Sequence, residues 1–249
     1  MLTTTNMQLG QWAASRTDVF PTEMCELMSR LHSNVDAHSL ADTKRIVSKA
    51  FGGLPFQDIF EEFDEKPLGI GAIAQVYKAK LKPSLLPPEN IEREKRHFRE
   101  ALRHNVDVIA KSAPPRDRAP SAYVAVKVLH PRVESMIHRD LRIMRFFAAA
   151  INAIPTMEWL SLPVEVDKFG EMMRLQLDLR IEGNNLEKFR HNFQNRPTVT
   201  FPKPYLDYTT RQVLIEEFAH GIPLSAFLEN GAGVFQKDIA DMGLDSFLV

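Results

Sequence analysis

The chain changes from a helical to an alternating pattern of hydrophobic residues. Apolar residues recur at helical spacing over 21–31, and a capping-box pattern opens the segment 39–53, which ends in two glycines. We therefore predict that residues 1–60 are helical. Over 73–81 the larger apolar residues alternate with polar ones, and this pattern predicts a strand.

More strands and helices follow. The runs 122–129 and 212–218 predict strands, and helical spacing over 131–152 and about 164–193 predicts long helices. Residues 82–121 are rich in proline and charge, which indicates a surface insertion. Strands and helices do not alternate regularly enough for a doubly wound sheet, so we predict a mixed α+β fold.

Composition excludes several classes of protein. The 249 residues are 44% hydrophobic and 25% charged, which argues against disordered, collagen-like and disulfide-rich chains. A net charge of -1 gives no general attraction to nucleic acid. The single cysteine, Cys25, lies in an apolar helical pattern and is interpreted as a core residue. The apolar segment 146–154 is too short to span a membrane and indicates a core helix, and no targeting segment is visible.

A glycine-rich stretch carries the first candidate chemistry. Gly69, Gly71 and Ala74 fit the pattern G-x-G-x-x-G/A of dinucleotide-binding loops. They also fit, more loosely, the glycine-rich loop of kinases. A dinucleotide loop lies between a buried strand and a helix. Here a charged, proline-marked segment precedes the glycines and a strand follows them. The flanks favour a kinase-like loop over nucleotide phosphates, with a plain β-hairpin turn as the alternative.

Lys127 ends the sequence Val-Ala-Val-Lys, which corresponds to the V-A-I-K strand motif of kinases. In that motif the lysine contacts the α- and β-phosphates and pairs with a glutamate from a helix. Glu182, on the second long predicted helix, is the candidate partner. The alternative is an edge-strand lysine whose ammonium group reaches solvent.

In their order along the chain, these motifs resemble those of the UbiB / aarF-domain-containing atypical kinases, and they look closest to the second aarF-domain kinase branch of animals and fungi. The resemblance covers nearly the whole chain apart from residues 82–121. It implies a protein-kinase-like fold, ATP and Mg²⁺ as cofactors of the full-length protein, and a mitochondrial location. It also implies a link to coenzyme Q and lipid metabolism, with a lipid or membrane surface as a further partner.

The resemblance assigns roles to individual residues. It implies a catalytic pair, Lys127 with Glu182, and a hinge at 217–219 that receives adenine. The positions implied to bind the cofactor are Gly69, Gly71, Ala72, Ala74, Val76, Lys127, Glu217 and Phe218.

Two regulatory motifs of the family are altered here. The K-x-G-Q signature of the N-terminal extension reads Gln8-Leu9-Gly10-Gln11, and the E-x-D motif reads Gln176-Leu177-Asp178. Both charges of one expected ion pair are therefore replaced by amides. We predict that Gln8 contacts Gln176 and holds the extension in place.

One kinase-like sequence is misleading. His138-Arg139-Asp140-Leu141 spells the start of a catalytic loop, but Arg145 stands where that loop has asparagine, and the sequence precedes Glu182. We interpret it as a polar helix face. The scattered histidines show no metal-ligand spacing, so we predict no metal site.

The motifs divide the chain into three parts. We expect a helical extension over 1–66, a kinase-like N-lobe over 67–218 and the start of the C-lobe over 219–249. In kinases the catalytic Asp and the metal ligands follow the hinge, so we expect a C-terminally truncated atypical kinase or ATPase that is inactive in this form. The alternative is a non-catalytic pseudokinase scaffold that binds a lipid or a partner protein.

Overall fold

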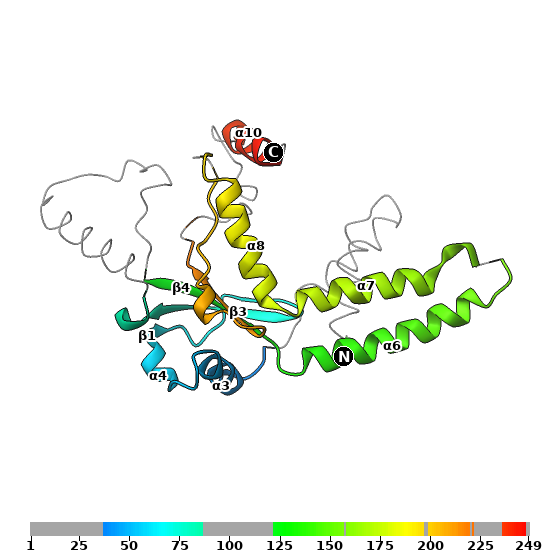
Figure 1. Cartoon of the computed structure of the whole chain (residues 1–249), viewed down its shortest axis with the longest axis horizontal. Helices are drawn as coiled ribbons and strands as arrows, with labels where there is room; N and C mark the ends of the chain where they lie inside the picture. The colour runs from blue at the N-terminus through cyan, green and yellow to red at the C-terminus, as the bar shows by residue number, and fades with distance from the viewer. Residues whose placement is uncertain are drawn as a thin grey trace, which may run out of the picture.

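The computed structural model describes residues 37–86, 122–156, 158–196, 199–219, 221 and 236–247. Within these ranges an antiparallel sheet of five strands forms the centre of the fold (Figure 1). The strands follow the order β1-β3-β4-β5, and the short β2 also pairs with β3. Their bounds are β1 Phe60–Phe63, β2 Gly69–Ile70, β3 Ala74–Leu81, β4 Tyr123–Leu129 and β5 Val213–Glu217. The predicted α+β class is confirmed.

Helices cover both faces of the sheet. α3 and α4 lie on one side and α8 on the other, while α6 and α7 form a long hairpin that projects away from the sheet (Figure 1). The helices of the described ranges are α3 Leu40–Ala50, α4 Phe56–Ile59, α6 Val133–Asn152, α7 Leu162–Gln176, α8 Leu179–Asn192 and α10 Gln236–Phe247. Three short 3₁₀ helices accompany them: η2 Pro83–Leu85, η4 Glu158–Leu160 and η5 Leu206–Tyr208.

Strand alternation creates two apolar clusters, because successive side chains point to opposite faces of the sheet. The cluster beneath α3 includes Val47, Tyr77, Leu81, Val126 and Ile215. The cluster on the other face joins the sheet to the long helices and includes Ala74, Leu129, Ile137, Met173, Leu179 and Leu214. The sheet is therefore held between α3 on one face and the helices that follow β4 on the other.

Helix α3 has the ends that the sequence predicts. The hydroxyl of Ser39 accepts a hydrogen bond from the backbone N–H of Asp42 at 3.1 Å, as an N-cap residue does. After the helix, Gly52 and Gly53 adopt φ values of 69° and 87°, which glycine reaches without steric cost. The predicted helix start at Ser39 is confirmed.

The prediction of a single helix over about 164–193 is wrong. The structure has two helices there, and α7 ends at Gln176 before α8 begins at Leu179. The carboxylate of Asp178 accepts a hydrogen bond from the N–H of Arg180 at 3.1 Å. This N-cap starts a new helix because it satisfies a free amide at the helix start.

The helical prediction for residues 1–60 also needs correction at its end. Phe60–Phe63 form strand β1, which pairs with β3 through Phe63 and Ala79. Such a short edge strand carries little local signal, and its pairing with β3 decides its conformation. The helix predicted over 21–31, and Cys25 within it, lie outside the described residues.

The prediction of a surface insertion over 82–121 is wrong for its first residues. Leu86 is buried, and the hydroxyl of Tyr208 donates a hydrogen bond to the carbonyl of Leu85 at 2.9 Å. The core therefore reaches residue 86, and residues 87–121 lie outside the described ranges.

The apolar run 146–154 is only partly a core segment. Ala148 is buried, but Phe146 and Phe147 are 71% and 59% exposed. Helix α7 covers one face of α6, and the apolar residues extend beyond that face. None of the helices in the described part of the chain has the length and apolar character needed to cross a bilayer.

Candidate functional site

The strand register places the predicted loop next to the predicted lysine. Gly69 of β2 pairs with Val76 of β3, Val76 pairs with Lys127 of β4, and Lys127 pairs with Leu214 of β5. Paired residues in neighbouring antiparallel strands share a face of the sheet. The glycine-rich stretch and Lys127 therefore lie in one row across the sheet, on the face that α8 covers.

Lys127 and Glu182 form an ion pair on this face. The Nζ atom of Lys127 donates to both carboxylate oxygens of Glu182, at 2.7 and 2.8 Å. The side chains are 24% and 42% exposed, so the pair is open to solvent and to a ligand. Because one lysine contacts both oxygens, the carboxylate holds the ammonium group in a defined position.

A glycine lets α8 approach the sheet closely enough for this pair. A Cβ atom at Gly183 would lie 3.3 Å from side-chain atoms of Leu214 and Leu206, and 3.4 Å from Thr209. These distances are shorter than ordinary van der Waals contact. Gly183 therefore sets the separation between α8 and β5, and with it the position of Glu182.

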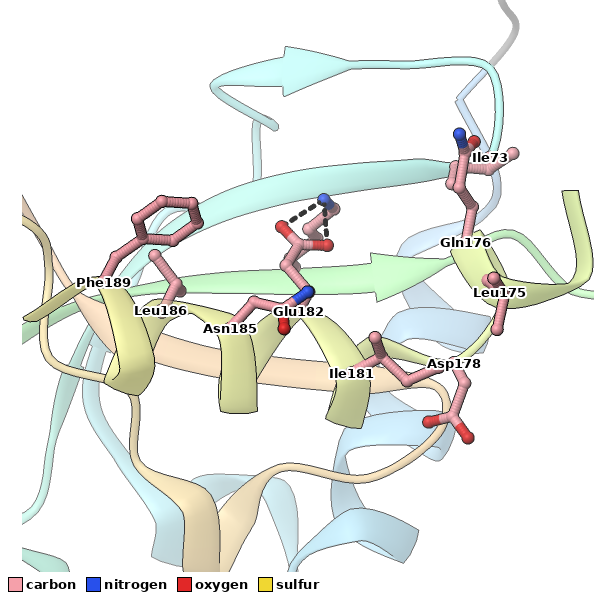
Figure 2. A pocket seen from close by; sticks show the side chains of 10 residues that line it. Ile73, Leu175, Gln176, Asp178, Ile181, Glu182, Asn185, Leu186 and Phe189 are labelled. Carbon is pink, nitrogen blue, oxygen red and sulfur yellow. Dashed lines mark hydrogen bonds and ion pairs between the residues drawn. The ribbon is translucent and has the colours of Figure 1, made fainter. Parts of the chain in front are cut away.

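The ion pair lies in an open pocket of about 520 Å³ between α8 and the start of β3 (Figure 2). This volume is within the roughly 300–1,000 Å³ typical of small-molecule sites. Half of the lining residues are apolar, and the other half are polar or charged. The lining residues are Ile73, Lys127, Leu175, Gln176, Asp178, Ile181, Glu182, Asn185, Leu186 and Phe189.

The backbone of the glycine turn is exposed and carries no side chain at Gly69 or Gly71. Neither Gly69 nor Gly71 adopts the positive φ that would require glycine, and no atom lies within 4 Å of a Cβ placed on Gly69. The turn is closed by a hydrogen bond from the N–H of Gly71 to the carbonyl of Ala74 at 2.8 Å. Both glycines are exposed, whereas Ala72 and Ala74 are buried. The absence of side chains at the two glycines leaves room for a ligand to approach the backbone.

Two histidines that the sequence does not single out support this turn. The Nε2 atom of His130 lies 2.9 Å from the carbonyl oxygen of Gly71, and its Nδ1 lies 2.7 Å from Nδ1 of His38. Burial lowers the pKa of His38 to about 4 and also lowers the pKa of His130. These residues are 92 positions apart, and no spacing rule brings them together.

Glu216 is a third ionisable residue on the Lys127 face. It pairs with Ala125 of β4, two residues from Lys127, and so points to the same side of the sheet. Burial and the nearby Glu182 carboxylate raise the pKa of Glu216 to about 7, and the Lys127 ammonium opposes this. A carboxyl group that is partly protonated near neutral pH therefore lies beside the ion pair.

The altered E-x-D motif lines the pocket, but its acidic residue is engaged elsewhere. The carboxylate of Asp178 points away from Glu182 (Figure 2) and accepts two side-chain hydrogen bonds from Arg180, at 2.6 and 2.9 Å. These bonds lower the pKa of Asp178. Gln176 is an exposed pocket residue. Gln8 and Gln11 lie outside the described residues, and so does the predicted contact between Gln8 and Gln176.

The predicted hinge begins at Glu217, the last residue of β5. The N–H of Glu217 donates to the carbonyl of Lys203 at 2.8 Å, and the N–H of Phe218 donates to the carbonyl of Tyr123 at 3.0 Å. Both amides are thus used within the fold, and neither is free to bind a base. The side chain of Phe218 lies against Lys78, whose Nζ is 5.2 Å from the ring centre.

The sequence 138–141 is not a uniformly polar surface. His138 and Arg139 are exposed, but Asp140 is only 5% exposed. The interpretation as a polar helix face is therefore wrong for Asp140, which belongs to the buried side of α6. Within the ranges that the structure covers, no three His, Cys, Asp or Glu side chains are grouped closely enough to hold a metal ion.

The antiparallel sheet, the glycine turn and the strand lysine paired with a helix glutamate define a protein-kinase-like lobe. The comparisons agree with this class. The ABC1 atypical kinase-like domain matches residues 30–85 and 117–249. The chain belongs to this family, which is the UbiB/aarF family of atypical kinases.

Curated relatives match nearly the whole chain. A mitochondrial ABC1 family protein of Schizosaccharomyces pombe is 45% identical over 96% of this chain and 33% of its own length. One from Saccharomyces cerevisiae is 42% identical over 97% of this chain and 34% of its own. A probable protein kinase UbiB of Pasteurella multocida is 30% identical over 97% and 41%. The chain thus spans about a third of the length of the two fungal relatives.

A solved structure shares the fold. The complex of Rv3197 with erythromycin from Mycobacterium tuberculosis superimposes with a TM-score of 0.51 at 19% identity, over 90% of this chain and 46% of the other. This likeness supports the kinase-like architecture.

Proposed function

We propose that this chain forms the nucleotide-binding lobe of an atypical kinase or ATPase. The observation that carries the proposal is the ion pair between Lys127 and Glu182 in an open pocket beside a bare glycine turn. In kinases a lysine held by a helix glutamate contacts the α- and β-phosphates. Here Lys127 would contact the phosphates, Glu182 would orient it, and Gly69 and Gly71 would leave space above them.

ATP with Mg²⁺ is the ligand we propose. The apolar side chains of the pocket suit a base and a sugar, and Lys127 supplies a positive charge for phosphate. Mg²⁺ would neutralise phosphate charge when bound. At the hinge, any contact of Glu217 or Phe218 with the base would come from a carbonyl or a side chain, because their N–H groups are hydrogen-bonded within the fold.

Titration of Mg-ATP against the protein by calorimetry tests this proposal. We expect binding that is lost or weakened at least tenfold in Lys127→Met, because about 1.4 kcal/mol corresponds to a factor of ten and a charge-assisted phosphate contact contributes at least that much. Lys188→Met, an exposed lysine on α8, is the matched control and should bind as the wild type does. Equal affinity of Lys127→Met and wild type would contradict the proposal.

A non-catalytic scaffold is a second proposal. The observation that favours it is the amide at Gln176, which lines the pocket where the family motif has an acidic residue. The two proposals predict different effects of nucleotide on the thermal stability of the protein. A ligand at 100 times its Kd stabilises the folded state by about 2.7 kcal/mol, and a scaffold that binds no nucleotide would gain nothing. The absence of a shift in Tm at millimolar Mg-ATP would favour the scaffold.

We also propose that the protein acts in mitochondria and contributes to coenzyme Q and lipid metabolism. The two fungal relatives are named as mitochondrial, and the link to coenzyme Q comes from the family resemblance. Loss of the gene should lower the quinone content of isolated mitochondria, and expression of a Lys127→Met protein should not restore it.

A further inference from the structure

His130 holds the tip of the glycine turn at two points. Its backbone N–H donates to the carbonyl of Ile73 at 2.8 Å, and its ring Nε2 lies 2.9 Å from the carbonyl oxygen of Gly71. His130 is the residue after β4 and is only 7% exposed. One buried residue therefore fastens the turn to the strand that carries Lys127.

The hydrogen bonds of the His130 ring belong to a longer chain of hydrogen bonds, in which each donor and acceptor follows from the one before. The Gly71 carbonyl can only accept, so Nε2 of His130 carries the hydrogen, and Nδ1 of the neutral ring is an acceptor. Nδ1 of His38, at 2.7 Å, must then donate, and Nε2 of His38 must accept from the hydroxyl of Thr43 at 2.9 Å. The Thr43 oxygen is free to accept in turn from the hydroxyl of Tyr77 at 3.0 Å.

The inner end of this chain is fixed in the core. Thr43 and Gln75 are fully buried, and Tyr77 is 1% exposed. The side chain of Gln75 accepts from the N–H of His38 at 3.1 Å and donates to its carbonyl at 3.3 Å, and it also donates to the hydroxyl of Tyr77. Buried groups with satisfied hydrogen bonds have little freedom to rearrange. The position of the His38 ring is therefore set by α3 and β3 together.

We propose that His130 is a positioning residue of the nucleotide site, which holds the glycine turn in place for phosphate binding through a hydrogen-bond chain that begins in the core beneath α3. The inference rests on the proposed nucleotide-binding function. It goes beyond that function because it couples the turn to α3, on the opposite face of the sheet from Lys127.

The chain requires both rings to be neutral. A second proton on His130 would place two N–H donors opposite each other between the Nδ1 atoms, and a second proton on His38 would occupy the Nε2 atom that accepts from Thr43. The charged group that faces His38 is Asp42, which raises its pKa, while burial and His130 lower it. For His130, burial lowers the pKa and the Gly71 carbonyl opposes this. Burial is the largest effect for both, so the neutral forms persist at physiological pH.

Replacement of the ring nitrogens tests the inference. His130→Phe keeps an aromatic ring but removes both side-chain bonds. We expect Mg-ATP and Mg-ADP to bind roughly three- to tenfold more weakly, in line with the loss of one ordering hydrogen bond. Adenosine, which has no phosphate to contact the turn, should bind with unchanged affinity. His130→Gln, whose amide can donate to Gly71 and accept from His38, should restore most of the Mg-ATP affinity.

The control is His138→Phe, at an exposed histidine on α6, which should bind all three ligands as the wild type does. If wild type binds no nucleotide, the proposed function fails. If wild type binds Mg-ATP and His130→Phe binds it equally well, or loses adenosine affinity to the same extent, the positioning role fails.

A measurement on the unmodified protein avoids any loss of folding in the variants. Nitrogen chemical shifts of ¹⁵N-labelled histidine at pH 7 report which ring nitrogen carries hydrogen. We expect His130 to carry it on Nε2 and His38 on Nδ1. The opposite tautomer at either residue would overturn the chain.

Discussion

Replacing Glu216 with glutamine should stabilise the protein at alkaline pH and have almost no effect at acidic pH. Burial and Glu182 raise the pKa of the native carboxyl from 4.5 to about 7. As the pH rises from 4.5 to 7, the unfolded chain loses this proton before the folded chain does. The folded state therefore loses stability over that range and reaches a lower plateau above pH 7. Glutamine has nearly the same shape and does not ionise, so it avoids this loss.

The expected magnitude follows from the two pKa values. A change in pKa from 4.5 to about 7 corresponds to roughly 3 kcal/mol in the free energy of unfolding, before any solvent screening. Glu216 is partly exposed, and solvent screening reduces the value to about 2 kcal/mol. Glu216→Gln should therefore raise the free energy of unfolding by about 2 kcal/mol at pH 8 and change it little at pH 4.5.

Urea unfolding followed by circular dichroism at pH 4.5, 6, 7 and 8 measures this difference. Glu171→Gln, at an exposed glutamate on α7, is the matched control and should show a small difference that does not vary with pH. The reasoning is refuted if Glu216→Gln changes stability by the same amount at every pH, because burial of a titrating carboxyl would then not be the cause.

Three other changes test separate parts of the structure. Thr43→Val should cost about 1–3 kcal/mol in urea unfolding, because it leaves the hydroxyl hydrogen of Tyr77 without its acceptor and Nε2 of His38 without its donor; a loss below about 0.5 kcal/mol, well under that range, would contradict the buried network. Gly183→Val should cost about 1–3 kcal/mol and weaken Mg-ATP binding, because the added atoms meet Leu214; unchanged nucleotide affinity would show that α8 can move without disturbing the site. The pKa of His38, lowered from 6.5 to about 4, predicts that the contribution of this residue to stability is complete above pH 6.5 and is lost toward pH 4, and His38→Gln should remove this part of the pH dependence.

Motifs with a known chemistry could be found from sequence. Lys127 and Glu182 are 55 positions apart, but each matches a residue type that the kinase pattern requires. The strand at 74–81 was predictable because its alternation persists over several residues, and the strand at 123–129 because it is rich in β-branched residues. The N-cap at Ser39 was predictable because it depends only on local contacts.

Features that depend on contacts between distant parts of the chain could not be predicted from the sequence. His38 and His130 carry no local signal, and only the pairing of β3 with β4 and the packing of α3 bring their rings together. The break between α7 and α8 was missed because the apolar spacing continues across it, although Asp178 is a good N-cap residue. The raised pKa of Glu216 depends on the neighbouring strand and on α8, and neither is visible in the sequence around it.

The pairing of β3 with β4 determines how the protein responds to insertions and deletions at different positions. The connection from Leu81 to Tyr123 joins adjacent antiparallel strands, and doubling the number of residues between two joined ends costs only about 0.6 kcal/mol in closure free energy. Changes of length between Leu86, which is buried, and Tyr123 should therefore be tolerated. A single residue inserted within β4 has a much larger effect, because a slip of one position exchanges the two faces of a strand. Val126 would then face the pocket, and Lys127 would be driven into the apolar cluster beneath α3.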